Sequence, residues 1–379
     1  MDLPELNVAV IGGGIGGVAS AIAFARRGAH VNVFEQAEAL AEVGAVLQIS
    51  ANGMAVLRAL GVVGDVPPTA VRSTGTDLRD YRSGRQISHV LPPKAGSTWY
   101  FHRADLLDLL VEAALKLGVT FNMGRKIDGA DPVTGQIGAD AQGFDLVVAA
   151  DGGQSRVRFR LNGPSRPRFS KQAAWRAVVP WAGAGNSTSA VLTMAPGRHV
   201  VSYPVRNGTL MNVVGIEERD DWTEEGWKLR GDPDDFRTRF SDFGGAVGDL
   251  LKQVNEVYLW ALYLHPVADR WYGGRLALLG DAAHPTLPFM AQGACLALED
   301  AWTIAACVDA ADTLDDGLLR YQALRQSRAA RIVAAAAGNA RKFHLSPPAS
   351  WVAQAALKVT GSALARRYDW IYSYDATQA

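Results

Sequence analysis

The chain has 379 residues, of which 48% are hydrophobic and 20% charged. This composition is typical of globular proteins, and the length exceeds what one hydrophobic core fills, so we expect two domains. Lysine plus arginine and aspartate plus glutamate both number 38, and this balance without a basic cluster excludes a nucleic-acid partner. With no signal-peptide pattern and no apolar run of about 18 residues, we expect a cytoplasmic protein without a membrane partner.

The first predicted unit, residues 7–35, reads as strand, turn, helix and second strand. Gly12, Gly14 and Gly17 form a G-x-G-x-x-G pattern, and Glu35 closes the second strand. Such glycines permit a tight turn, backbone approach to a pyrophosphate and helix–sheet packing, while the acidic residue accepts a hydrogen bond from a ribose. We therefore predict nucleotide binding. The alternative is a glycine-rich turn that binds nothing, and this motif alone does not distinguish FAD from NAD.

Two kinds of sequence alternate along the rest of the chain. A helix that Asn52 is expected to cap follows the first unit. Residues 72–99 and 171–265 are glycine-punctuated and rich in short β-type runs, which predicts a mostly antiparallel sheet. The segments between and after them return to helices and buried strands, and the alanine- and arginine-rich stretch from Leu318 to Phe343 predicts one long helix.

We therefore expect an α/β fold in which a Rossmann-like domain carries an inserted, mostly antiparallel β-sheet domain and is followed by C-terminal helices. The expected boundaries are 1–71, 100–170 and 266–340 for the Rossmann-like domain, 72–99 and 171–265 for the β-sheet domain, and 341–379 for the helical tail.

Two further aspartates come directly after predicted buried strands. Asp151-Gly152 follows one apolar run, and Gly280-Asp281 follows another. In parallel sheets, ligands bind beyond the carboxyl ends of the strands, so both aspartates would lie at the rim occupied by the glycine motif. A dissociable NAD rarely needs three such loops, whereas an extended FAD does. The combination therefore favours FAD.

These three motifs, in this order, resemble those of the class A, single-component FAD-dependent aromatic hydroxylases, a family that includes salicylate hydroxylases. The resemblance implies that the Rossmann-like domain binds FAD and that the β-sheet domain binds substrate. By the same resemblance, the residues that hold FAD are Gly12, Gly14, Gly17, Glu35, Arg103, Asp151, Asp281, Gly293 and Ala294.

The loop after Asp281 is expected to hold the flavin ring. Pro285 and Pro288 restrict its shape, and a helix then begins through Gly293 and Ala294. Free backbone N–H groups at that helix start would face N1 and the C2 carbonyl of the flavin and stabilise its reduced, anionic form. The alternative is a rigid strand-to-helix connection without a ligand.

This loop departs from the usual family pattern at two positions. Ala291 stands where a glycine is usual, and Cys295 stands where an asparagine is usual; this version resembles 3-hydroxybenzoate 6-hydroxylases and 6-hydroxynicotinate 3-monooxygenases. We expect Cys295 to be a small buried residue and not a redox thiol. Cys307 lies twelve residues further on the same helix, about 18 Å away, so we expect no disulfide. We expect no metal site.

The resemblance implies a reaction with NADH or NADPH, dioxygen and a small aromatic acid as partners. The nicotinamide reduces the flavin, oxygen adds at its C4a carbon, and one oxygen atom is transferred to an electron-rich ring. The chain has no second glycine motif of this kind, so the sequence does not indicate which nicotinamide is used.

Five residues are candidates for the substrate site. Tyr203, Gln48 and Pro288 are the expected catalytic positions, and Tyr203, Gln48, Phe289 and His199 the expected substrate contacts. Strand alternation puts His199 and Tyr203 on one face. The alternatives are that Tyr203 and Gln48 are ordinary core residues and that His199 is structural.

Other assignments remain open at this stage. Arg82 and Arg176 are candidates to bind a substrate carboxylate, with a solvated surface as the equal alternative for the insert that carries Arg82. A hydroxynicotinate-type acid is an alternative to a hydroxybenzoate. Another flavoenzyme of this scaffold, and a flavin-free binding protein, are the competing functions. The arginines of the long helix, such as Arg325 and Arg328, are expected on a solvated face, and the protein is expected to be a monomer or a homodimer.

Overall fold

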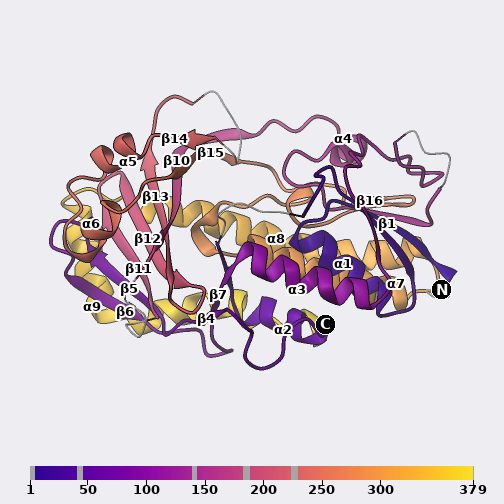
Figure 1. The fold of residues 1–379 in the computed structure, drawn as a ribbon, viewed down its shortest axis with the longest axis horizontal. Coiled ribbons are helices and arrows are strands. Elements are labelled where there is room, and N and C mark those ends of the chain that lie inside the picture. Colours follow the sequence, from indigo (N-terminus) through magenta and orange to yellow (C-terminus); the bar gives the residue numbers. More distant parts are fainter. Residues whose placement is uncertain (1–4, 41–45, 139–142, 182–187, 223–228, 379) are drawn as a thin grey trace.

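The structure is a computed structural model that describes residues 5–40, 46–138, 143–181, 188–222 and 229–378. Figure 1 shows two sheets at opposite ends of an elongated molecule. Helices α5 and α6 lie at the end that contains β12 and β13, and helices α1, α3 and α7 lie in the part that contains β1. Helices are found in several segments, and their bounds are α1 (Ile15–Ala25), α2 (Ala51–Ala59), α3 (Arg103–Lys116), α4 (Arg156–Asn162), α5 (Pro233–Arg239), α6 (Gly245–Leu251), α7 (Gly293–Asp309), α8 (Leu314–Lys342), α9 (Ala349–Arg367) and α10 (Asp369–Tyr372).

The first sheet has six strands in the described part of the chain, in the order β16-β17-β9-β1-β2-β8. Its strands are β1 (Asn7–Ile11), β2 (His30–Phe34), β8 (Thr120–Asn122), β9 (Leu146–Ala149), β16 (Tyr272–Gly273) and β17 (Leu276–Leu278). All neighbours are parallel except β16 with β17. The carboxyl ends of β1, β9 and β17 therefore lie side by side.

The central strands of this sheet are short apolar runs with no polar alternation. Every residue of β9 and β17 is buried, as expected for parallel strands covered on both faces. Helix α1 packs against both α3 and α7. A rigid layered core thus presents three strand ends at one edge.

The second sheet has eight strands among the described residues, in the order β14-β15-β10-β13-β12-β11-β5-β6. Its strands are β5 (Thr76–Asp80), β6 (Gln86–Val90), β10 (Arg168–Pro180), β11 (Ala190–Ala195), β12 (Arg198–Val205), β13 (Leu210–Glu218), β14 (Arg230–Gly231) and β15 (Val257–Leu264). All pairs are antiparallel except β11 with β5. The predicted α/β fold with a mostly antiparallel second sheet is confirmed.

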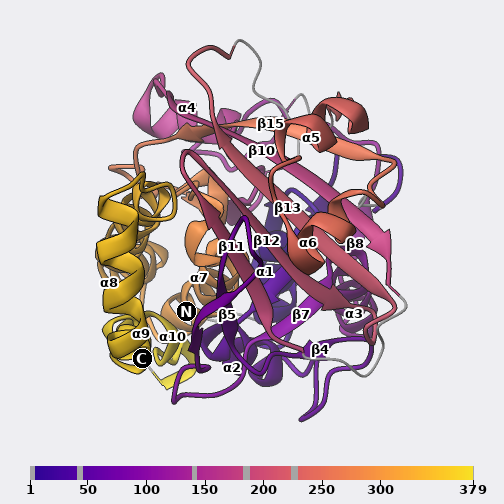
Figure 2. The same ribbon diagram turned by 90° about the vertical axis from the view of Figure 1, so that its left-hand side faces the viewer.

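The two faces of the second sheet bury different partners. On the outer face, Trp175 and Val213 pack with Phe236 and Phe240 against α5 and α6, which Figure 2 shows in front of the sheet. The inner face is formed by the alternate residues of the same strands. It packs against the part of the molecule built on the six-stranded sheet, including Leu287. Strand alternation therefore assigns each side chain of β10, β12 and β13 to one of these two faces.

A third, three-stranded sheet, β3-β7-β4, lies where the two halves meet. Its strands are β3 (Val46–Ile49), β4 (Val71–Arg72) and β7 (Trp99–His102). Val46, Val71 and Tyr100 from this sheet pack on Tyr203 and Val205 of β12. Short 3-10 helices complete the fold, at η2 (Gly280–Ala282), η3 (Pro288–Met290) and η4 (Ala376–Gln378). None of the helices in the described ranges is long and apolar enough to cross a membrane.

Helix α8 confirms the long predicted helix, but its arginines correct the expectation of a solvated face. Arg325 is fully buried, and Arg328 is 9% exposed. Asn52 is a second correction, because Ser50 and not Asn52 occupies the N-cap of α2. Asn52 lies inside the helix and is 1% exposed. In both cases partners distant in the sequence bind the side chain.

Candidate active site

The glycine motif forms the turn between β1 and α1 at the edge where the strand ends meet. Gly12 has φ +106°, and a Cβ there would lie 2.4 Å from the carbonyl oxygen of Ala150. A Cβ at Gly17 would lie 2.0 Å from the carbonyl oxygen of Gly12. Both positions therefore require glycine, and the loop stays close to the end of β9.

The start of α1 has the features of a phosphate site. Gly14 is the N-cap and supplies no side-chain hydrogen bond, so the first backbone N–H groups remain available to a ligand. The carboxylate of Glu35 lies beside this turn, accepting hydrogen bonds from the backbone N–H of Gly13 at 2.7 Å and of Ala37 at 2.9 Å. An exposed edge with free donors and a carboxylate fits the adenosine half of a dinucleotide.

Asp151 follows β9 and has one carboxylate oxygen ready for a ligand. Its Oδ2 accepts a hydrogen bond from the backbone N–H of Arg156 at 3.1 Å. Its Oδ1 is buried and has no partner among the described residues. Burial, only partly offset by hydrogen bonds, raises the pKa of this carboxyl. An unsatisfied buried oxygen at this edge fits a cofactor hydroxyl or amide donor.

Arg158 joins the loop of Asp151 to the loop of Asp281, a role that the sequence did not indicate. The Arg158 side chain is nearly buried and donates to the carbonyl oxygens of Pro266 and, at 3.4 Å, Ala282. A Cβ at Gly153 would lie 3.6 Å from the Pro285 ring. The second and third motifs are therefore held in contact.

Asp281 and Arg103 lie close to the glycine motif. A Cβ on Gly14 would lie 4.0 Å from Nη2 of Arg103. The Asp281 side chain is exposed, and it lies near enough to Arg103 for the two opposite charges to interact. The three predicted motifs and Arg103 thus converge on one site.

A buried ionic network lies directly behind Asp281. Asp300 on α7 is fully buried, and its Oδ2 lies 2.5 Å from Nε2 of His284 and 3.1 Å from the backbone nitrogen of Gly280. Its Oδ1 accepts a hydrogen bond from Nε of Arg325 at 2.8 Å. Burial alone would raise the pKa of Asp300, but the charges of His284 and Arg325 outweigh it and lower the pKa to about 2.

Glu299 extends this network towards the start of α7. It accepts hydrogen bonds from Arg328 at 2.8 Å and pairs with Arg325 at 2.6 Å. Asn52 donates to Glu299 at 2.6 Å and to the side-chain oxygen of Gln292 at 2.9 Å. Gln292, the residue just before α7, is therefore held by Asn52 of α2. Asn52 is itself held by Glu299, which pairs with the arginines of α8.

The first turn of α7 has the geometry expected for flavin contact. Gln292 is the N-cap, its side chain is committed to Ser50 and Asn52, and it gives no capping hydrogen bond. The N–H groups of Gly293 and Ala294 therefore have no side-chain cap. Ala291 has φ +51°, a left-handed conformation that favours glycine, which explains the glycine usual at this position.

Tyr203 and Gln48 meet across the boundary between the two halves. Burial raises the pKa of the Tyr203 hydroxyl, against the charge of Arg176 and the polar side chain of Gln48 beside it. The Tyr203 and Tyr100 ring centroids are 4.6 Å apart. The Arg176 guanidinium stacks on Trp260, 4.8 Å from the ring centroid. Tyr203 and one of the two predicted arginines thus share the inner face, and Gln48 approaches Tyr203 from β3.

Asn212 is a further residue of this face, and the sequence analysis missed it. It pairs with Tyr203 of β12 on one side and with Val178 of β10 on the other. It is fully buried, yet neither its amide nitrogen nor its amide oxygen has a partner among the described residues. Only the strand register, which is not visible in the sequence, brings this amide next to Tyr203.

Of the other substrate candidates, His199 and Phe289 pack together, whereas Pro288 and Arg82 lie elsewhere. His199 is on the same face of β12 as Tyr203, and its ring centroid lies 5.7 Å from that of Phe289. Pro288, in η3, is exposed. Of the two readings for Arg82, the solvated surface agrees with the structure, because this residue is exposed at the turn after β5 and stacks on Tyr81 of the outer cluster. It does not reach the inner face.

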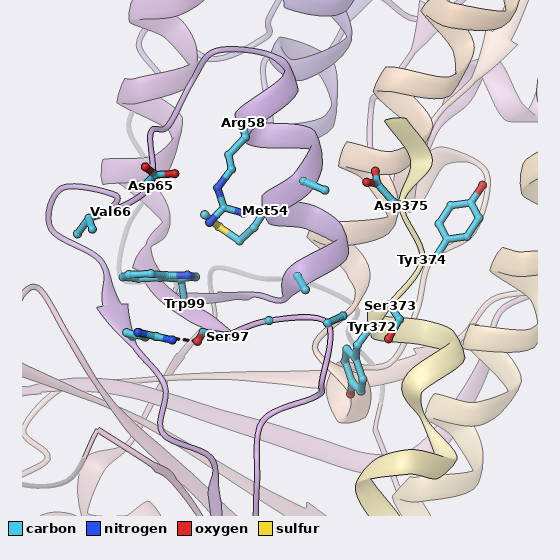
Figure 3. Close-up of a pocket in the computed structure, with 15 residues that line it drawn as sticks. Met54, Arg58, Asp65, Val66, Ser97, Trp99, Tyr372, Ser373, Tyr374 and Asp375 are labelled. Atoms are coloured by element: carbon cyan, nitrogen blue, oxygen red, sulfur yellow. Dashed lines mark hydrogen bonds between the residues drawn. The ribbon is translucent and has the colours of Figure 1, made fainter. Parts of the chain in front are cut away.

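A separate groove of about 480 Å³ lies between α2, residues 95–99 and the chain's last described segment. Figure 3 shows Arg58, Asp65 and Trp99 on one side of it and Tyr372 and Asp375 on the other. None of the predicted cofactor or substrate residues lines it. We therefore assign the candidate active site to the edge where the three motifs converge at the strand ends, and not to this groove.

The buried network makes a prediction about stability. Replacing Asp300 with Asn removes the charge that pairs with the buried Arg325 guanidinium, and we expect a loss of about 3 kcal/mol in the free energy of unfolding at neutral pH. Because the folded-state pKa of Asp300 is lowered to about 2, the deficit should shrink as the pH falls below about 4. Urea denaturation at several pH values measures both effects.

The control for Asp300→Asn is Lys116→Ala, which breaks an exposed pair with Glu112 on α3. This change should alter the free energy by less than about 0.5 kcal/mol. Equal losses in the two variants would contradict a special role for the buried network.

The two cysteines give a second prediction. Cys295 is fully buried, and Cys307 is 4% exposed; burial raises the pKa of the Cys295 thiol to about 11. The expectation of a small buried residue at Cys295 is confirmed. Both thiols should resist a disulfide-exchange reagent in the native protein and react in denaturant. Fast labelling of Cys295 in the folded protein at pH 7 would contradict this.

The site can now be compared with known proteins. A family model described as "FAD binding domain" matches residues 5–336. The chain is 34% identical to 3-amino-4-hydroxybenzoate 2-monooxygenase of Streptomyces cremeus over 90% of this chain and 88% of that protein. It is 30% identical to 3-hydroxybenzoate 6-hydroxylase of Klebsiella oxytoca over 97% of each chain. A substrate complex of salicylate hydroxylase superposes with a TM-score of 0.81 at 25% identity, covering 99% of this chain and 97% of the other.

These matches agree with the three motifs and with the convergence of their residues at one edge. The resemblance inferred from the sequence is confirmed, and FAD is the cofactor of this family. The chain belongs to the FAD binding domain family of flavoprotein hydroxylases.

Proposed function

We propose that this protein is an FAD monooxygenase that hydroxylates a small aromatic acid of the hydroxybenzoate or aminohydroxybenzoate type, with NADH or NADPH and dioxygen. One observation carries the proposal: the polar side chains of Tyr203, Asn212 and Arg176 share the inner face that packs against the flavin half. The relatives from Streptomyces cremeus and Klebsiella oxytoca are named for aminohydroxybenzoate and hydroxybenzoate substrates, which supports this substrate class.

The proposed division of labour follows the two halves of the fold. Segments 1–71, 100–170 and 266–340 would bind FAD, segments 72–99 and 171–265 would bind substrate, and 341–379 would form a helical tail. Gly12, Gly14, Gly17, Glu35, Arg103, Asp151, Asp281, Gly293 and Ala294 are the residues assigned to FAD. When bound, FAD would supply the oxygen-transfer chemistry after reduction by the nicotinamide.

The residues of the inner face would bind and orient the aromatic acid. Arg176 offers a guanidinium for the carboxylate, because its stacking on Trp260 holds it at the inner face. Tyr203, with the Gln48 side chain beside its hydroxyl, would position a ring hydroxyl, and Phe289 would supply an apolar wall. Burial of this pocket would exclude water from the reacting ring. Pro288 would keep the loop before α7 in one shape.

The test is a substrate panel with the flavin-loaded protein. We expect 3-amino-4-hydroxybenzoate or 3-hydroxybenzoate to accelerate oxidation of NADH or NADPH, and to yield a product that contains one atom of ¹⁸O from ¹⁸O₂ by mass spectrometry. Turnover of 6-hydroxynicotinate alone would favour an N-heteroaromatic acid. A colourless protein that takes up no FAD would favour the flavin-free binding protein.

Asn212 allows a sharper test, because its unpartnered amide should be costly without a ligand. We expect Asn212→Leu, which keeps the number and branching of the side-chain heavy atoms, to raise the free energy of unfolding by about 1–2 kcal/mol. The same change should weaken binding of the aromatic acid by about tenfold, since one hydrogen bond is lost. Chemical denaturation and titration of the flavin absorbance measure the two quantities.

The matched control is Asn339→Leu. Asn339 is also buried, but its amide oxygen accepts a hydrogen bond from Tyr368 at 2.9 Å, so this variant should lose stability. A loss of stability in Asn212→Leu, or unchanged ligand affinity, would contradict the assignment of Asn212 to the substrate pocket.

A further inference from the structure

The last described segment of the chain, residues 368–378, packs over the buried network between α7 and α8. Figure 1 places this end of the chain beside α2, and its final helix, η4, packs against both α2 and α7. Ile371 and Ala376 are buried in two different apolar clusters of the protein. The segment is therefore anchored at both of its ends on the part of the molecule that carries the proposed FAD site.

Arg328 of α8 joins this segment to α7. Its Nε and Nη2 donate to the two carboxylate oxygens of Glu299, both at 2.8 Å. Its Nη1 and Nη2 donate to the carbonyl oxygens of Trp370 at 3.0 Å and Ile371 at 2.7 Å. These carbonyls lie at the end of the short helix α10, where backbone acceptors have no partner within the helix. All three nitrogens of the guanidinium are thus used, and one side chain binds α7 and the C-terminal segment together.

An aromatic ring of the same segment covers this junction. The Tyr374 ring centroid lies 4.0 Å from the guanidinium carbon of Arg328 and 5.7 Å from that of Arg325. A cation over an aromatic face is stabilised most where water is excluded. The C-terminal segment therefore shields both arginines of the network from solvent, in addition to binding one of them through its backbone.

The contacts continue from this junction to the helix start that we propose to face the flavin. Glu299 also accepts a hydrogen bond from Asn52 at 2.6 Å, and Asn52 donates to Gln292, the N-cap of α7, at 2.9 Å. The same segment approaches this turn directly. Burial raises the pKa of the Tyr372 hydroxyl, and the Cys295 thiol in the first turn of α7 lies near enough to raise it further. The C-terminal segment thus reaches the start of α7 both through the network and by its own side chain.

We propose that Arg328 and the C-terminal segment position FAD: the docked segment holds the first turn of α7 in the orientation in which its backbone N–H groups stabilise the reduced, anionic flavin. Arg328 is a positioning residue, because it acts on the flavin through Glu299 and Asn52. Since coupling between two binding events is reciprocal, FAD should in turn stabilise the docked segment. The inference rests on the proposed assignment of the start of α7 to FAD, and it does not depend on which aromatic acid is the substrate.

Arg328→Lys tests the junction, because lysine keeps the positive charge but lacks the planar fork that serves a carboxylate and two carbonyls at once. We expect FAD to bind about tenfold more weakly, measured by titration of the apoprotein. Displaced donors also stabilise the negative charge of the reduced flavin less. The reduction potential of the bound flavin, measured against a dye of known potential, should therefore fall by about 30 mV, which is a further tenfold loss of affinity for the reduced form.

Hydrogen exchange of residues 368–378 in the wild-type protein is a second readout, and it needs no variant to fold. We expect loading with FAD to slow exchange of these backbone amides by on the order of tenfold, because opening of the segment then carries the cost of weaker FAD binding. Mass spectrometry of the C-terminal peptides measures the rates. Equal rates with and without FAD would overturn the coupling.

Arg331→Lys is the matched control. Arg331 also lies on α8 and stacks on Trp370, 4.1 Å from the ring centroid, but it is exposed and forms no ion pair with Glu299 within the described ranges. This change should leave both the FAD affinity and the potential as in the wild type.

The outcomes separate positioning from packing. A purely structural role for Arg328 predicts that Arg328→Lys lowers the free energy of unfolding of the apoprotein while the potential stays unchanged, and that result would overturn the proposal. A wild-type protein that takes up no FAD would overturn the proposed function together with it. Uptake of FAD without hydroxylation of any aromatic acid would overturn the proposed function alone, because neither readout requires a substrate.

Discussion

The fold depends most on the buried charges between helices α7 and α8. Glu299, Asp300 and Arg325 are fully buried, and a charge left alone in such surroundings is prohibitively costly. These side chains are therefore compatible only with the helix register in which all of them pair. A shift of α8 by one turn, about 5.4 Å, would separate every pair at once. The network thus defines one arrangement of the two helices, beyond what apolar packing alone would specify.

The buried network holds the candidate site at two points. Through Asp300 it holds Gly280 and His284, and so the loop that carries Asp281, one of the residues that we propose to bind FAD. Through Glu299 and Asn52 it holds Gln292, and so the first turn of α7. The loop of Asp281 and the start of α7 are therefore fixed by adjacent residues of one helix, Asp300 and Glu299. The geometry of the proposed flavin site thus depends on this buried network.

The parts that the sequence predicts well are local ones. The three motifs were identifiable because each is a strand, a turn and a helix within a few tens of residues, and the turn chemistry requires glycine or aspartate there. Arg325 and Asn52 were misjudged because their partners lie 25 and 247 residues away, and composition alone makes an arginine-rich helix resemble a solvated one. Asn212 was missed because only strand register places it beside Tyr203. His199 was assigned to the correct face of β12 by alternation, but its partner His344 is 145 residues away.

The buried polar groups of this protein fall into two kinds with different consequences. The carboxylates of the α7–α8 network, Glu299 and Asp300, have protein partners on both of their oxygens, so they add to the specificity of the fold without a ligand. The amide of Asn212 and the Oδ1 of Asp151 lack partners among the described residues, and each such group costs about 1–3 kcal/mol of stability. A fold retains such a cost where a ligand offsets it. The groups that weaken the free protein are therefore the ones through which FAD and the aromatic acid would stabilise it, because binding restores the missing hydrogen bonds.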